Sequence, residues 1–167
     1  MAIDVTVSET IAAPRDEVAA YVVDHRNDTS WIGGIQESEL LGDGTLAVGS
    51  DVRRVASFMG RRIEYVSRVV ELEPGRRLAM RSVRAPFPME VTYSFDDAPG
   101  GTVASVQVRG EPRSMYKLAE PLLAARVRRS VARDLRTLRP IMEASGPWRT
   151  TSNSPTASER WSRARPA

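Results

Sequence analysis

The chain has 167 residues, the usual length of one globular domain and enough to bury a hydrophobic core. Hydrophobic residues make up 41% and charged residues 27% of it, which excludes a wholly disordered or fibrous protein. The absence of cysteine excludes a disulfide framework, a thiolate metal site and a thiol nucleophile. No apolar run reaches the roughly 18 residues of a membrane span, and the N-terminus lacks the order of a signal peptide, so we expect a cytoplasmic protein.

The formal net charge of +3 comes entirely from the C-terminal segment. Residues 146–167 contain four of the 24 basic residues and one of the 21 acidic residues, so residues 1–145 carry 20 of each. The segment is also rich in proline and small polar residues, which bury too little apolar surface to offset the entropy of ordering the chain. We therefore predict one globular domain over residues 1–145, a disordered tail over residues 146–167, and no nucleic-acid partner.

The first elements are a strand and two short helices. Alternating apolar and polar residues predict a strand over residues 2–12. Pro14 is expected at the first position of a short amphipathic helix with an acidic first turn. A further helix of one to two turns is predicted over residues 27–32, with Asn27 or Asp28 as its N-cap.

Glycine and proline pairs then recur at the intervals of an antiparallel meander. Between them, period-two alternation predicts six strands, over residues 36–41, 51–58, 62–72, 77–83, 89–96 and 102–110. Each strand has one apolar and one polar face, as in an open antiparallel sheet with one buried side. Arg54, Arg81 and Glu90 are expected to face solvent.

Residues 113–144 are rich in alanine, leucine, arginine and methionine, which predicts a long C-terminal helix. Pro121 lies where two apolar stripes of different phase meet, so we expect a bend there. Opposite the longer stripe runs a line of four arginines: Arg126, Arg129, Arg133 and Arg136. A solvated outer face is the simpler interpretation of this line, and contact with an anionic membrane or an acidic partner is the alternative.

This order of elements resembles the START/Bet v1-like (SRPBCC) superfamily and, within it, the bacterial polyketide cyclase/dehydrase and lipid-transport family. The matching segments are residues 7–14, 17–18 with Tyr21, 27–31, 48–50, 65–74, 77–82, 90–95 and 120–123. The resemblance covers residues 3–144 and implies an α+β helix-grip fold, in which a curved seven-stranded antiparallel sheet wraps around the C-terminal helix. Its motifs mark a fold rather than a reaction.

The resemblance also implies a hydrophobic cavity between sheet and helix that holds one small lipophilic molecule. Combined with the alternation of the strands, it implies a lining of apolar and aromatic side chains, with Trp31 at the mouth. The candidate ligand-binding residues are Trp31, Phe58, Tyr65, Met80, Met89, Val91, Tyr93, Met115, Leu118 and Leu122. Several methionines beside aromatic side chains suit an adaptable pocket.

No pattern in the sequence is typical of a catalytic, metal or cofactor site. His25 is the only histidine and is expected at an exposed helix end, and serine elbows, phosphate loops and dinucleotide glycine motifs are absent. We therefore predict no metal and no cofactor, and favour binding or carriage of a small lipophilic ligand. A cofactor-free cyclase or dehydratase that uses groups such as Tyr65 or Tyr93 in the same cavity is the alternative. A second alternative is a lipid carrier that docks on anionic membranes through the arginine line.

Overall fold

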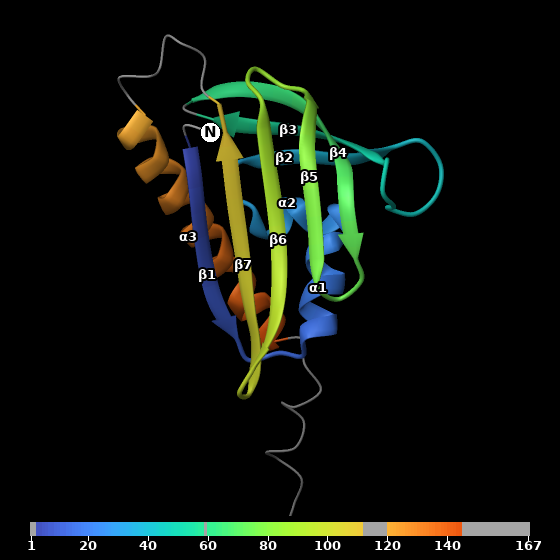
Figure 1. Cartoon of the computed structure of the whole chain (residues 1–167), viewed down its shortest axis with the longest axis vertical. Helices are drawn as coiled ribbons and strands as arrows, with labels where there is room; N and C mark the ends of the chain where they lie inside the picture. The colour runs from blue at the N-terminus through green and yellow to red at the C-terminus, as the bar shows by residue number, and fades with distance from the viewer. Residues whose placement is uncertain (1–2, 59, 112–119, 145–167) are drawn as a thin grey trace, which may run out of the picture.

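The computed structural model describes residues 3–58, 60–111 and 120–144 (Figure 1). The first elements are β1 (Ile3–Ile11), α1 (Arg15–Val23), the 3-10 turn η1 (His25–Asn27) and α2 (Asp28–Trp31). Then follow β2 (Ile35–Leu41), β3 (Asp51–Phe58), β4 (Arg61–Glu73), β5 (Arg77–Arg84), β6 (Met89–Ala98), β7 (Gly101–Gly110) and α3 (Glu120–Ala144). The predicted tail over residues 146–167 lies outside the described residues.

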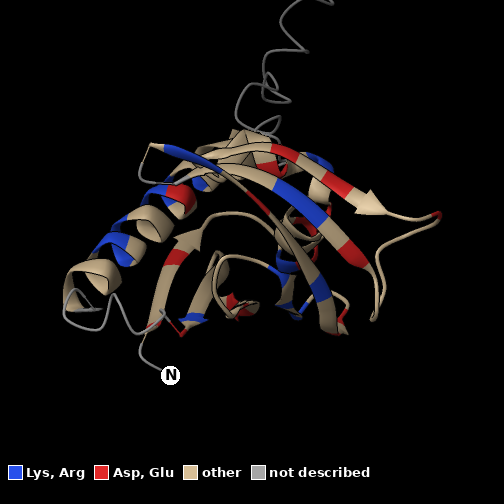
Figure 2. Cartoon of the chain, turned by 90° about the horizontal axis from the view of Figure 1, so that it is seen from above, with Lys and Arg blue, Asp and Glu red and all other residues tan. Residues whose placement is uncertain are grey.

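The seven strands form one antiparallel sheet in the order β1-β7-β6-β5-β4-β3-β2. The six strands from β2 to β7 are a meander in which each strand pairs with the next, and β7 also pairs with β1. The sheet is curved and arches over α1 and α2, while α3 runs beside β1 (Figures 1 and 2). This α+β helix-grip architecture confirms the fold predicted from the sequence.

The core lies between the concave side of the sheet and the helices. Among its most deeply buried large side chains are five from β1, α1, β5 and α3, each at most 2% exposed: Ile11, Val18, Leu78, Leu135 and Leu138. The apolar faces of the sheet and of α3 pack against each other through these side chains, and this packing excludes water from both faces. Hydrophobic burial therefore sets the position of α3.

The apolar stripe predicted for the C-terminal helix is confirmed, because Val131, Leu135, Leu138 and Met142 are buried. The predicted helix start and the residues before the expected bend lie within 112–119, outside the described residues. Pro140 lies inside α3, where it has no N–H to donate to the preceding turn, and the helix nevertheless continues to Ala144. None of the described helices is long and apolar enough to cross a membrane.

The ends of the short helices differ from the prediction in their capping contacts. Pro14 precedes α1 as its cap instead of occupying its first position. Asn27 does occupy the N-cap position of α2, but its side-chain N–H donates to the Tyr21 carbonyl, 3.0 Å away, and caps nothing. The capping side chain of this region is Asp24, whose carboxylate accepts the Arg26 backbone N–H at the start of η1. Local capping rules would assign the Asn27 side chain to the start of α2. In the structure this side chain instead makes a hydrogen bond outside the helix.

Candidate functional site

A cavity of about 150 Å³ lies between the concave side of the sheet, α2 and α3. Most of its lining is apolar, and the polar side chains among them come from β3, β4, β6 and α3. The lining residues are Trp31, Ile32, Ile35, Arg54, Tyr65, Ser67, Met80, Met89, Val91, Tyr93, Val106, Val108, Val131 and Asp134. Residues from α2, α3 and every strand except β1 thus meet at one place.

Six of the candidate ligand-binding residues line this cavity: Trp31, Tyr65, Met80, Met89, Val91 and Tyr93. Period-two alternation accounts for the three from β6, because residues two apart on a strand face the same side of a sheet. Trp31 was expected at the mouth of the cavity but is only 3% exposed. Its ring meets Tyr93 edge-on, with ring centroids 6.2 Å apart.

Four of the candidates do not appear in the lining. Leu122 was predicted wrongly: it is 66% exposed and does not contact the cavity. The physical reason is the phase of α3, in which Leu122 lies one turn before Arg126 and so shares its solvent-facing side. Met115, Leu118 and the side chain of Phe58 lie outside the described residues.

Arg54 is buried, contrary to the expectation that it faces solvent. Its residue is 7% exposed, and its Nε donates to Asp28 Oδ2 at 2.7 Å. Ser38 Oγ donates to the same oxygen, also at 2.7 Å. Alternation along β3 puts Arg54 on the inward face with Val52, so the signal for its direction was present in the sequence. Its partner, Asp28, lies on α2 and carried no such signal.

The guanidinium of Arg54 stays charged inside the protein. Burial is the largest single effect and disfavours its charge, but the Asp28 carboxylate together with Tyr93 and Tyr65 outweighs it, so the pKa of Arg54 lies above its ordinary value. Arg54 Nη1 lies 3.5 Å from the Met80 sulfur, and a thioether sulfur is a weak acceptor. Arg54 Nη2 donates to no acceptor among the described residues. The outer edge of the guanidinium is therefore available to a molecule in the cavity.

Further hydrogen-bond donors line the same space, among them two tyrosine hydroxyls and the Trp31 indole N–H. Burial raises the pKa of Tyr65, and it also raises that of Tyr93, so both hydroxyls stay protonated at neutral pH. Trp31 Nε1 is buried and has no hydrogen-bond partner among the residues that the structure describes. Buried donors are usually paired, so this N–H and the edge of Arg54 together favour a guest that carries oxygen acceptors.

Asp134 is the one carboxylate of the lining, and sequence analysis did not single it out. It lies on α3 and its Oδ1 accepts the Gly33 backbone N–H at 2.8 Å, which ties α3 to the loop between α2 and β2. Burial raises the pKa of Asp134 to about 6, although the Gly33 N–H and the charge of Arg133 oppose the rise. A carboxyl with this pKa exchanges its proton close to neutral pH.

Replacing Asp134 by asparagine tests this electrostatic environment. The folded-state pKa exceeds the unfolded value, so the wild-type fold gains stability as pH falls from about 7 towards 4 and loses it as pH rises. Asparagine keeps an acceptor for Gly33 and carries no charge. We expect the stability advantage of Asp134→Asn over wild type to grow by about 1 kcal/mol between about pH 4.5 and pH 7.5 in urea titrations, after allowance for solvent screening. An advantage that does not change with pH would contradict the assignment.

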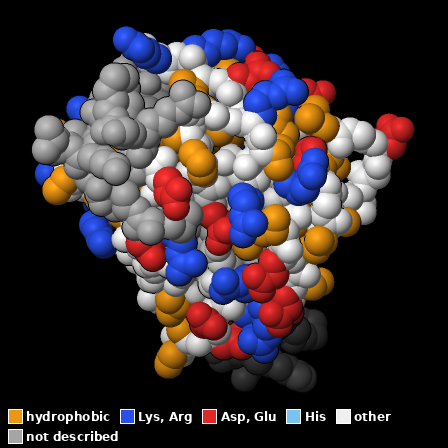
Figure 3. Space-filling model, turned by 45° about the horizontal axis from the view of Figure 1, so that its top comes forward, with side chains coloured by type: hydrophobic (Ala, Val, Ile, Leu, Met, Phe, Trp, Pro, Cys, Tyr) orange, Lys and Arg blue, Asp and Glu red, His pale blue; other side chains and the backbone are white. Residues whose placement is uncertain are grey.

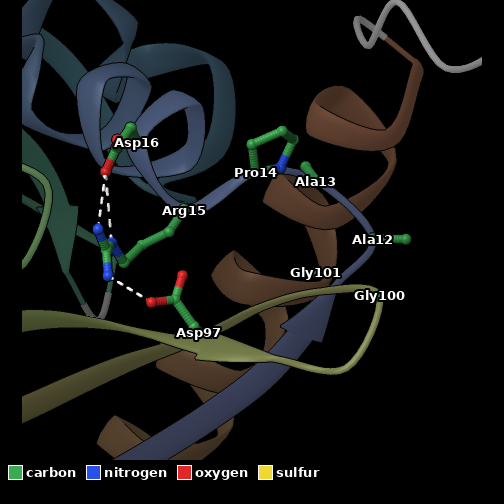
Figure 4. A pocket seen from close by; sticks show the side chains of 8 residues that line it. All are labelled: Ala12, Ala13, Pro14, Arg15, Asp16, Asp97, Gly100 and Gly101. Carbon is green, nitrogen blue, oxygen red and sulfur yellow. Dashed lines mark hydrogen bonds and ion pairs between the residues drawn. The ribbon is translucent and has the colours of Figure 1, made fainter.

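A second hollow of about 590 Å³ opens at the surface between the β1–α1 junction and the β6–β7 hairpin (Figure 4). Arg15 points into it and contacts Asp16 at 3.2 Å and Asp97 at 2.5 Å. The cation is thus neutralised by two side chains of the protein, and none of the candidate ligand-binding residues lines this hollow. The cavity beside Arg54 is therefore the candidate functional site.

Solved structures with the same fold come from several bacteria. A Thermus thermophilus protein has a TM-score of 0.74 and 20% identity over 86% of this chain and 99% of its own. A START superfamily protein from Mycobacterium smegmatis has a TM-score of 0.68 and 18% identity, over 86% and 99%. The Zhui aromatase/cyclase from Streptomyces sp. R1128 has a TM-score of 0.68 and 21% identity, over 84% and 93%. At such identities the likeness is one of fold.

The sequence also matches a known protein family over most of its length. A search of curated protein sequences found no match. The family described as polyketide cyclase / dehydrase and lipid transport matches residues 2–143, which include every residue of the cavity lining. The resemblance noted from the sequence motifs covers the same region. The chain therefore belongs to the polyketide cyclase / dehydrase and lipid transport family.

Proposed function

We propose that the protein binds a small, mainly apolar molecule in the cavity between the sheet and α3, with an oxygen-bearing end against Arg54. The observation that carries this proposal is a buried guanidinium with an uncommitted edge in an otherwise largely apolar lining. Small-molecule sites usually have this form, in which apolar walls supply affinity and a few polar groups set orientation. Arg54 would supply orientation, and Met80, Val91 and Val106 would supply apolar contact.

The volume of the cavity supports a small guest. At about 150 Å³ it matches an engineered protein cavity that binds benzene, so it holds about one ring in the present conformation. Met80 and Met89 are flexible side chains that can move to enlarge it. We therefore assign the site to a monocyclic or similarly compact molecule with a carboxylate or carbonyl group, which a guanidinium edge recognises.

Val91→Phe should block the site. The added ring would enter the cavity, and we expect the affinity for benzoate, a one-ring carboxylate, to fall at least about tenfold in ligand-detected NMR. Overpacking costs about 1–3 kcal/mol, so a melting curve must show that the variant is folded. Val83→Phe is the matched control, because Val83 is 50% exposed and does not line the cavity.

Two results decide this test. Weak binding by Val91→Phe together with wild-type binding by Val83→Phe supports the proposed site. A folded Val91→Phe protein that binds benzoate as well as wild type contradicts it. Native mass spectrometry of protein purified from its own host then identifies the natural ligand by its mass.

Catalysis in the same cavity is the second candidate function. It is favoured by Asp134, whose pKa near 6 suits a general acid or base, and by Tyr65, which lines the same cavity. A cofactor-free cyclase or dehydratase would convert the bound molecule during incubation, whereas a carrier would release it unchanged. Mass analysis of the ligand before and after incubation with the protein distinguishes the two functions.

A further inference from the structure

The outward side of α3 carries four arginines in one row: Arg126, Arg129, Arg133 and Arg136, here called the arginine row. Their spacings of three and four put them on one face of the helix, and all four are exposed. Blue segments recur along α3 in Figure 2. The opposite face holds the buried Val131 and Leu138, so the row points directly away from the core.

The arginine row lacks the neutralising partners found elsewhere in the protein. On the sheet, Arg53 pairs with Glu64 at 3.0 Å and Arg68 with Asp51 at 2.8 Å. Basic and acidic side chains are correspondingly interspersed on the face shown in Figure 3. No carboxylate of the described residues forms an ion pair with the row, and the one acidic residue between positions 121 and 142, Asp134, faces the cavity.

An exposed apolar side chain extends the arginine row. Leu122 lies four residues before Arg126, hence one helical turn along the same face, and is 66% exposed. It is the most exposed large hydrophobic side chain of the described residues. Four arginines that form no ion pair with a described carboxylate, together with an apolar residue, therefore occupy one straight, convex strip of the surface.

We propose that this strip docks on an anionic lipid bilayer. Acidic headgroups offer many mobile negative charges, so a row of arginines binds them without a shaped groove, and Leu122 enters the boundary between headgroups and acyl chains. Nucleic acid is a poorer fit, because residues 1–145 carry equal numbers of basic and acidic groups and the sheet pairs its arginines. Docking does not depend on the function proposed for the cavity.

Docking would also place the cavity close to the membrane. Val131 and Asp134 on the inner side of α3 line the cavity, while Arg129 and Arg133 occupy its outer side. A single helix therefore separates the bilayer from the site. Such an arrangement would give a lipophilic ligand a short route between membrane and cavity. This consequence rests on the proposed function, because it requires that the cavity binds such a ligand.

Vesicle sedimentation of the full chain tests the proposal. We expect binding to phosphatidylcholine vesicles that contain about 30% phosphatidylserine, no binding to phosphatidylcholine alone, and release in about 0.5 M NaCl. Changing all four arginines of the row to glutamine should lower the partition coefficient at least about tenfold. Leu122→Ala should lower it about threefold while the salt dependence stays unchanged.

A charge-matched variant is the control. Arg61, Arg62, Arg76 and Arg84 are exposed and lie outside the row, so their change to glutamine removes the same charge. We expect this variant to bind within about twofold of wild type. Equal losses in both variants, binding retained by the row variant, or no sedimentation of wild type with anionic vesicles would each overturn the proposal. Because benzoate binding is measured separately, failure of docking and failure of the cavity site are distinguishable.

Discussion

Replacing Asp28 by alanine is expected to lower the free energy of unfolding by about 3–5 kcal/mol. The change leaves the Arg54 guanidinium buried without its carboxylate, and it also removes the acceptor of Ser38. An unpaired charge in a low-dielectric interior is far more costly than the pair was favourable. Urea unfolding followed by circular dichroism measures the loss.

The double variant Asp28→Leu with Arg54→Leu separates the charge effect from lost packing. Both charges are then absent, so we expect the double variant to be more stable than Asp28→Ala by at least about 2 kcal/mol. It should also lose benzoate binding, since the proposed recognition group is gone. If the double variant were as unstable as Asp28→Ala, the ion pair would not be the cause of the loss.

Leu138→Ala is expected to cost about 2–5 kcal/mol of stability. Leu138 is 0% exposed in the core cluster, so truncation leaves a cavity that the closely packed surroundings fill only in part. Leu122→Ala is the matched control on the same helix, because Leu122 is 66% exposed, and its stability should stay within about 0.5 kcal/mol of wild type.

These two leucine variants also test the rotation of α3 about its axis. The proposed arginine row requires Leu122 outside and Leu138 inside. Similar stability losses for the two variants in thermal unfolding would contradict that rotation. They would also remove the basis for assigning the row to a bilayer contact.

The sequence by itself determined the secondary structure and the direction of most side chains. Apolar residues alternate with polar ones along the strands and recur every three to four positions along the helix. Both patterns are local, and they arise because one face of each element is buried. They were sufficient to predict the strands, the buried stripe through Leu135 and Leu138, and the cavity-facing side of β6 with Met89, Val91 and Tyr93. The family resemblance added the curvature of the sheet.

Only the tertiary structure decided which polar groups meet. Asp28 and Arg54 are 26 positions apart, and Gly33 and Asp134 are 101 apart, so local patterns carried no sign of either contact. Asp28 matches the sequence signal of a helix cap, yet its energetic role is to neutralise a buried arginine. The strength of an electrostatic contact depends on the distance between the two groups in space. The sheet topology and the position of α3 set these distances, so the sequence did not predict the polar part of the site.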